Sequence, residues 1–276
     1  MNQKQLRGLT AALMFGNVMS GLDSTIINTA IPAIIADLHG MQFMGWIVAI
    51  FLLGLAVAVP IWTKIGQKIS NKAALIVSLL LFIVGSALQG IAPNMLFFLT
   101  ARFIMGLGAG GMGSLPYIIA GRVYKNLAQR TRLLTLLTSS WSVAAISGPL
   151  LGGVIIDSMS WHWVFYLNVP IGIVALALIF AYYRHSYSQK HAIFDLWGAC
   201  WLTVCLMTFL FGIQLLGLVT IWLPLLLIIL SVLSLLVFWH VEKDGANPVI
   251  PVELFQNRAM RRLFTLRPGL GVLHRS

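Results

Sequence analysis

Two charged residues lie inside apolar stretches of the sequence, where a charge persists only if something compensates it. Asp23 lies in the stretch Leu22-Asp-Ser-Thr-Ile-Ile-Asn-Thr-Ala-Ile-Pro32. A carboxylate at membrane depth costs a few kcal/mol unless it is hydrated, paired or protonated. Asp23 is therefore expected to face a cavity as a proton-titrating or cation-attracting group. The alternative is a carboxyl group hydrogen-bonded to a neighbouring helix. Asn28 is expected about one turn away on nearly the same face.

Arg102 is a basic residue inside an apolar run, Phe97-Phe-Leu-Thr-Ala-Arg-Phe-Ile-Met-Gly106. Its permanently charged guanidinium group needs a partner or water at that depth. If the first three helices and the next three are inverted repeats, Asp23 and Arg102 lie on equivalent helices and face the same polar space. The alternative is that Arg102 snorkels toward the helix end, because Met95 opens its span only two turns earlier. The two hypotheses predict different depths for the guanidinium group.

Side chains that could support catalysis or metal binding do not gather in the sequence. His185, His191 and His240 form no ligand cluster on one face, and the seven acidic residues allow no Ser-His-Asp or paired-carboxylate set. We therefore expect no enzyme activity, no metal site and no cofactor.

The composition indicates that lipid is the solvent of this chain. Of its 276 residues, 59% are apolar and 9% are charged. That much apolar surface does not fit inside one soluble core. The net charge of +11 would also suit a nucleic-acid-binding protein, but the basic residues gather in every second loop between the apolar runs. This is the positive-inside pattern of membrane proteins, so nucleic acid is not an expected partner.

Runs of roughly twenty apolar residues predict about eight membrane-spanning helices. The predicted spans are Gly8–Ile35, Phe43–Ile61, Ala73–Ile91, Met95–Ile119, Leu133–Ile156, Trp163–Tyr183, Leu196–Leu216 and Ile221–Val241. The first six form one bundle over 1–183, residues 184–195 form a cytoplasmic hinge, 196–241 hold two additional transmembrane helices, and 242–276 form a cytoplasmic tail. The predicted fold class is an all-α integral membrane protein, multi-pass in the plasma or inner membrane, with both termini in the cytoplasm.

Glycines at a four-residue spacing predict close contacts between helices. Such a spacing lets two membrane helices approach each other closely. The pairs are Gly106 with Gly110 and Gly148 with Gly152. The second pair belongs to the segment Gly148-Pro-Leu-Leu-Gly-Gly153, where Pro149 removes one helical hydrogen bond and bends or loosens the fifth span. We expect that bend to serve as a gate.

Taken in order, these motifs resemble the major facilitator superfamily, and specifically its fourteen-helix drug:proton antiporter branch of multidrug exporters. The stretch Leu22 to Pro32 resembles the first-helix signature of that branch, and Arg102 to Gly110 resembles its fourth-helix motif with a buried arginine. Gly148 to Gly153 resembles its helix-five antiporter motif, and Trp161 to Gly172 resembles the segment that enters helix six.

The resemblance implies that Asp23 and Arg102 take part in proton coupling and that the bend from Gly148 to Gly153 helps to set the direction of export. A further family motif is expected in the cytoplasmic loop between the second and third spans. Its residues here include Gly66, Lys68 and Lys72. This loop departs from the family pattern with Gln67 in place of an acid and Ser70 in place of a glycine.

The resemblance runs from the N-terminus to about Met260, where six more helices would follow in the family. Residues Arg261 to Ser276 look like a shifted reading frame or an interrupted gene, so we expect a truncated or frameshifted tail. The leading hypothesis is a proton-coupled exporter of small lipophilic or cationic compounds, with the lipid bilayer and protons as partners, or a truncated inactive fragment of one. The alternatives are a non-transporting membrane partner subunit and a half-transporter that needs a second copy or a missing C-terminal half.

Overall fold

The computed structural model describes residues 2–124, 126–183, 196–216 and 219–244. Helices cover most of these residues. They are α1 (Gln3–Leu38), the short 3-10 helix η1 (Met41–Phe43), α2 (Met44–Lys68), α3 (Asn71–Gly90), α4 (Met95–Val123), α5 (Leu127–Ser158), α6 (His162–Tyr166), α7 (Asn168–Tyr182), α8 (Leu196–Leu215) and α9 (Trp222–Asp244). The predicted hinge over 184–195 and the tail beyond 244 lie outside the described residues.

Seven helical stretches in the described part of the chain are long and apolar enough to cross a membrane, with α6 and α7 counted as one. The remaining predicted span corresponds to α8, whose apolar stretch Trp201–Leu215 is shorter. None of the described residues lies in a β-strand. The predicted all-α, multi-span fold class is therefore confirmed.

The helices extend beyond the apolar runs that predict them. α2 ends at Lys68 and α3 begins at Asn71, so the basic loop predicted between the second and third spans is mostly helix. Polar side chains just outside the apolar runs cap the helices: the Ser70 hydroxyl accepts the Ala73 N–H at 3.2 Å. A cap of this kind satisfies an amide that has no partner within the first helical turn.

The sixth predicted span is divided into α6 and α7 at Leu167. Pro170 has no N–H group to donate to the Tyr166 carbonyl, which weakens a continuous helix at this point. Beside the break, the Ser86 hydroxyl of α3 donates to the Phe165 carbonyl at 2.8 Å and accepts from the Asn168 side-chain amide at 3.1 Å. A pairing between distant segments therefore stabilises the interruption.

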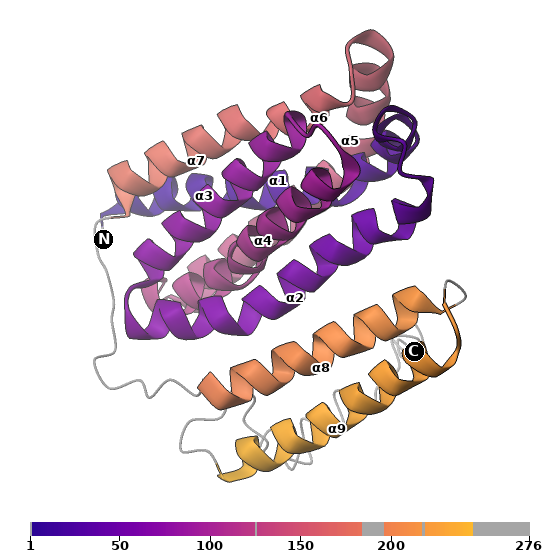
Figure 1. The fold of residues 1–276 in the computed structure, drawn as a ribbon. Helices are drawn as coiled ribbons and strands as arrows, with labels where there is room; N and C mark the ends of the chain where they lie inside the picture. The colour runs from indigo at the N-terminus through magenta and orange to yellow at the C-terminus, as the bar shows by residue number, and fades with distance from the viewer. Residues whose placement is uncertain (1, 125, 184–195, 217–218, 245–276) are drawn as a thin grey trace, which may run out of the picture.

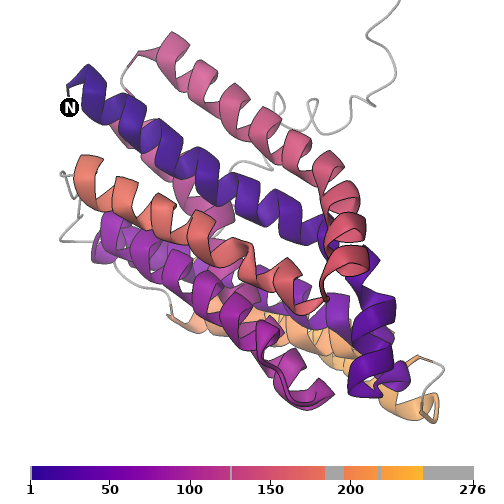
Figure 2. The ribbon, with the colours of Figure 1, turned by 90° about the horizontal axis from the view of Figure 1, so that it is seen from above.

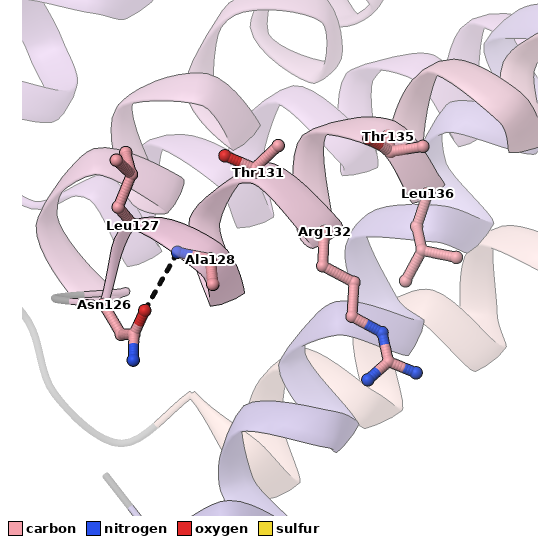
Figure 3. A pocket seen from close by; sticks show the side chains of 7 residues that line it. All are labelled: Asn126, Leu127, Ala128, Thr131, Arg132, Thr135 and Leu136. Carbon is pink, nitrogen blue, oxygen red and sulfur yellow. Dashed lines mark hydrogen bonds between the residues drawn. The ribbon is translucent and has the colours of Figure 1, made fainter.

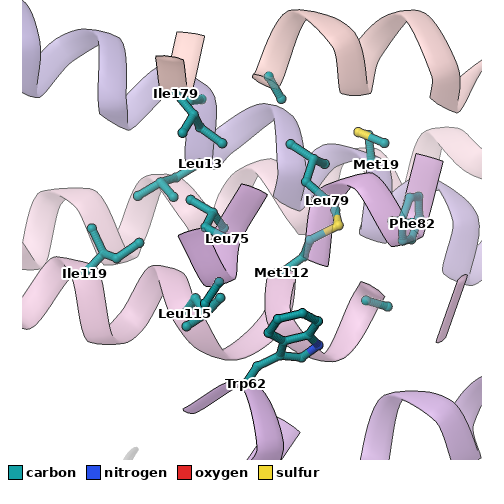
Figure 4. Close-up of a cluster of buried hydrophobic side chains, with 14 of the residues drawn as sticks. Leu13, Met19, Trp62, Leu75, Leu79, Phe82, Met112, Leu115, Ile119 and Ile179 are labelled. Atoms are coloured by element: carbon teal, nitrogen blue, oxygen red, sulfur yellow. The ribbon is translucent and has the colours of Figure 1, made fainter. Parts of the chain in front are cut away.

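In the bundle, α4 packs against both α2 and α3, while α1 packs against both α5 and α7 (Figures 1 and 2). Between these groups lies a core of buried side chains contributed by α1, α2, α3, α4, α5 and α7 (Figure 4). Its members include Leu13, Trp62, Leu79, Met112 and Ile179. The core joins the two groups of helices into one unit.

Helices α8 and α9 form a hairpin that lies beside α2 (Figure 1). The rings of Trp46 on α2 and Phe211 on α8 are 4.9 Å apart between centroids. Elsewhere the outer faces are apolar: Ile146 and Leu150 on α5 are 79% and 72% exposed, and Leu236 on α9 is 61% exposed. Large apolar side chains tolerate such exposure when lipid, rather than water, surrounds them.

Candidate functional site

Asp23 and Arg102 form an ion pair in the interior of the bundle. The Arg102 Nη1 group donates to both carboxylate oxygens of Asp23, at 3.0 Å each. The Asp23 side chain is 0% exposed and that of Arg102 is 1% exposed. The pair therefore links the middle of α1 to the first half of α4 across a distance of 79 residues in sequence.

Two further helices also contribute groups around the Arg102 guanidinium. Its Nε donates to the Ile47 carbonyl on α2 at 3.3 Å, and its Nη1 approaches the Gln89 side-chain oxygen on α3 at 3.5 Å. The central carbon of the guanidinium group, Cζ, also lies over the Phe51 ring of α2, 4.4 Å from the ring centroid. Burying two charges is expensive unless their hydrogen-bonding groups are satisfied. Here groups on α1, α2 and α3 surround the arginine of α4.

This geometry decides between the alternatives for the two charged residues. The snorkelling hypothesis for Arg102 is wrong, because the guanidinium group points into the bundle and meets a carboxylate there. The two side chains share one polar environment, as the inverted-repeat argument predicts. Asp23 is not open to a cavity in this conformation, since its carboxylate is hydrogen-bonded to a neighbouring helix.

Asn28 does not share the face of Asp23. Its side chain is exposed, whereas Asp23 is fully buried. Five residues along an α-helix correspond to a rotation of about 140° beyond a full turn, so the expectation of a common face is wrong. The amide that approaches the ion pair belongs instead to Gln89 of α3. Its nitrogen also donates to the Gly85 carbonyl at 3.2 Å.

Gln89 could have been found in the sequence as a lone amide within the third apolar run. Its side chain is 0% exposed, and its Nε2 donates to the Met105 sulfur at 2.9 Å. What the sequence does not contain is the position of Gln89 relative to Arg102, because that depends on how α3 packs against α4.

The glycine pairs lie where neighbouring helices come closest. A Cβ at Gly110 would lie 2.7 Å from the Ala58 Cβ on α2, and a Cβ at Gly106 would meet the Phe51 carbonyl of the same helix. On α5, a Cβ at Gly148 would lie 3.1 Å from the Ile26 nitrogen on α1, and Gly152 faces Thr29. The first pair thus faces α2, and the second faces α1.

Two further residues of the helix-five motif, Pro149 and Gly153, make no close contact with α1. Pro149 is exposed, and a Cβ at Gly153 would meet no atom within 4 Å. α5 continues past Pro149 to Ser158, and Figure 2 shows that the helix bends in its C-terminal part. The proposed gating role of this segment stays a prediction.

The three residues of the predicted loop motif lie at the ends of α2 and α3. Gly66 is buried against α3, where a Cβ would lie 2.7 Å from the Asn71 side-chain oxygen. Lys68 is the last residue of α2. Lys72 lies in the first turn of α3, and its ammonium group is 5.7 Å from the centre of the Phe180 ring on α7. The described residues contain no group of three or more His, Cys, Asp or Glu side chains that could hold a metal ion.

These features define a polytopic α-helical membrane protein with a charge pair buried between its first and fourth spans. The chain belongs to the Major Facilitator Superfamily, whose family model matches residues 13–241. It is 31% identical over 259 residues to Multidrug resistance protein 3 of Bacillus subtilis (strain 168), covering 93% of this chain and 50% of that relative. It is also 31% identical over 256 residues to Multidrug transporter protein MdtP of the same organism, covering 92% and 46%.

The fold is similar to that of a solved transporter, the POT family transporter PepTSo, with a TM-score of 0.61 and 11% sequence identity. That alignment covers 90% of this chain and 56% of the solved chain. The chain spans about half the length of the curated relatives it matches. The membership and the fold agree with the family resemblance that the sequence motifs suggest.

Proposed function

We propose that this chain takes part in the proton-coupled export of small lipophilic or cationic compounds across the cell membrane. The observation that carries the proposal is the buried ion pair between Asp23 and Arg102, which links α1 to α4. Two relatives, both named as multidrug resistance or multidrug transporter proteins, support the substrate class.

The ion pair supplies a physical route from protonation to helix movement. A proton on the Asp23 carboxyl removes its negative charge, while the Arg102 guanidinium remains charged. Removing one partner of a buried pair typically costs roughly 3–5 kcal/mol. A cost of that size favours a conformation in which α1 and α4 separate enough to let water reach the arginine. Loss of the proton restores the pair and the closed arrangement.

The orientation that we propose places the first residues of α1 and α5 in the cytoplasm. Basic side chains gather at this end, among them Lys4, Arg7 and Arg132, whereas Asp37 and Asp157 lie near the opposite end. Cytoplasmic segments of membrane proteins carry an excess of Lys and Arg. This asymmetry supports our proposal that the protein lies in the plasma or inner membrane with its N-terminus inside.

The test is energised efflux of a fluorescent lipophilic cation from cells that express this exact chain. The variant is Asp23→Asn, and the matched control is Asp157→Asn, which alters an exposed carboxylate at the end of α5. We expect the wild-type chain and the control to lower dye accumulation and the Asp23 variant to fail. Equal efflux by all three chains would contradict a coupling role for Asp23.

A second candidate is a half-transporter that works as two copies, or a membrane subunit that needs another partner. It is favoured by the exposed apolar face of α5. The same efflux experiment separates these cases. Efflux by this chain expressed alone favours assembly of two copies, whereas membrane insertion without efflux favours a partner subunit.

A further inference from the structure

A pocket opens at the end of the bundle where α1 and α5 begin and α4 finishes. Its volume is about 460 Å³. This falls within the range of roughly 300–1,000 Å³ that is typical of small-molecule sites. Arg7 of α1 and Arg132 of α5 line it from two different helices. Because two arginines repel cations, the pocket suits an anionic ligand.

The electrostatic character of this pocket is uniformly positive. Among the described residues that line it, none is acidic, and the first turns of α1 and α5 also hold no acid. Neither Arg7 nor Arg132 has a carboxylate within ion-pair distance in the described part of the chain. Both helices also direct the positive ends of their dipoles toward this end of the bundle. Two guanidinium groups are thus available to an anion.

The lining of the pocket also includes hydroxyl groups that are held by hydrogen bonds. The Tyr124 hydroxyl, just after α4, donates to the Leu6 carbonyl at 3.1 Å and lies 2.7 Å from the Thr10 hydroxyl. Burial raises the pKa of Tyr124 and outweighs the opposing hydrogen bond from Thr10, so the phenol adds no negative charge at physiological pH. The hydroxyl therefore ties the end of α4 to α1 within the lining of the same pocket.

The walls of the same pocket are apolar. They include Leu6 and Met14 of α1 and Leu133 and Leu136 of α5. Arg132 and Leu136 also line a second, adjoining hollow along the first turns of α5, of about 850 Å³. Figure 3 shows the Arg132 side chain extending away from α5, while Leu127 and Thr131 project in other directions. A ligand held by Arg132 therefore has an apolar surface beside its charged group.

We propose that this pocket binds the phosphate group of an anionic phospholipid, with the glycerol and upper acyl chains against the leucine and methionine walls. The planar guanidinium groups of Arg7 and Arg132 match the geometry of phosphate oxygens. Basic pockets between transmembrane helices on the cytoplasmic side commonly bind anionic headgroups. The apolar walls favour a lipid over free phosphate, which would leave them uncovered. Only the assignment to the cytoplasmic leaflet rests on the proposed function.

The test uses the full chain purified in a neutral detergent and titrated with dioctanoyl phosphatidylglycerol, with bound lipid counted by native mass spectrometry. Dioctanoyl phosphatidylcholine is the comparison lipid, and inorganic phosphate is the competing anion. The variant is Arg7→Gln with Arg132→Gln. Its matched control is Lys4→Gln with Arg130→Gln, which removes the same charge from the same two helices outside the lining of this pocket.

We expect the wild-type chain and the control to prefer phosphatidylglycerol. The double arginine variant should bind it roughly thirtyfold more weakly, the loss expected when two basic side chains no longer attract an anionic headgroup. Leu136→Trp should also weaken binding, because it fills the apolar wall and keeps both charges. Circular dichroism and thermal unfolding of each variant confirm that the chains compared are folded.

Three results would overturn the proposal. Equal losses in the variant and the control would mean a general effect of surface charge. Equal binding of the two lipids would exclude selection of an anionic headgroup. Complete displacement of phosphatidylglycerol by inorganic phosphate, with phosphate itself bound in an arginine-dependent way, would assign the site to a free anion. Binding is measured in micelles and without transport, so a failure of the export proposal leaves this result unaffected.

Discussion

At the scale of single residues, Arg102 connects more of the bundle than any glycine contact described above. Its guanidinium group meets the Asp23 carboxylate on α1, the Ile47 carbonyl and the Phe51 ring on α2, and the Gln89 amide on α3. The carboxylate of Asp23 and the guanidinium group of Arg102 differ in how each responds when the other is removed. A carboxylate that loses its partner can take up a proton and become neutral, whereas an arginine stays charged. The two ends of the ion pair are therefore unequal.

We predict that Asp23→Asn lowers the free energy of unfolding by about 3–5 kcal/mol, because it leaves a buried arginine without its counter-charge. Arg102→Gln should cost less, since protonation can neutralise the remaining carboxyl group. The double variant should be more stable than Asp23→Asn alone. Denaturation with sodium dodecyl sulfate in mixed micelles measures all three. A double variant that is no more stable than Asp23→Asn would contradict an energetic coupling between the two side chains.

At the scale of helices, the contact between α1 and α5 depends on residues without side chains. Gly21 of α1 approaches α5, where a Cβ would lie 2.7 Å from the Trp141 carbonyl, while Gly148 and Gly152 of α5 approach α1. Backbone atoms cannot move aside as a flexible side chain can. The distance between these helices is therefore set by glycines contributed from both sides.

We predict that Gly148→Ala destabilises the protein by about 1–3 kcal/mol, the usual cost of overpacking a close contact. The added methyl group would lie 3.2 Å from the Leu22 carbonyl and would also collide with the Thr25 hydroxyl. Gly153→Ala is the matched control on the same helix, because its Cβ would meet nothing within 4 Å. Thermal unfolding in detergent compares the two. If both variants unfold at the same temperature, the packing role assigned to Gly148 is wrong.

The sequence could predict those features of the helices that depend on each segment alone. The spans follow from apolar composition and length, which are properties of each segment alone, and the glycine spacing in α4 and α5 is equally local. The division of the sixth span at Leu167 was not predicted, because its contacts include a hydrogen bond from Ser86 of a distant helix to the Phe165 carbonyl. The role of Gln89 was missed for the same reason. The proximity of Asp23 and Arg102 could be predicted only by assuming that the two halves of the bundle are inverted repeats.

At the scale of the whole molecule, charge is distributed unequally between the two ends of the bundle. Arg7 and Arg132 lie at the end where α1 and α5 begin, and the exposed carboxylates of Asp37 and Asp157 lie near the other end. Asp37 accepts the Trp161 indole N–H at 3.0 Å, which joins the end of α1 to the segment before α6. One end thus suits the anionic headgroup that we propose, while the other has a hydrogen bond between an aromatic and an acidic side chain.

This asymmetry predicts the orientation of the protein in the membrane. In a chain with Cys200→Ala and Cys205→Ala, a cysteine is placed at Thr131, near the start of α5, or at Ser158, its last residue; both positions are exposed. Because Lys and Arg favour the cytoplasmic side, a membrane-impermeant maleimide should label Ser158→Cys in intact cells. It should label Thr131→Cys only after the membrane is permeabilised. The opposite pattern would reverse the proposed orientation and would move the phosphate-binding pocket to the outer leaflet, whereas labelling of both positions in intact cells would contradict a membrane-spanning α5.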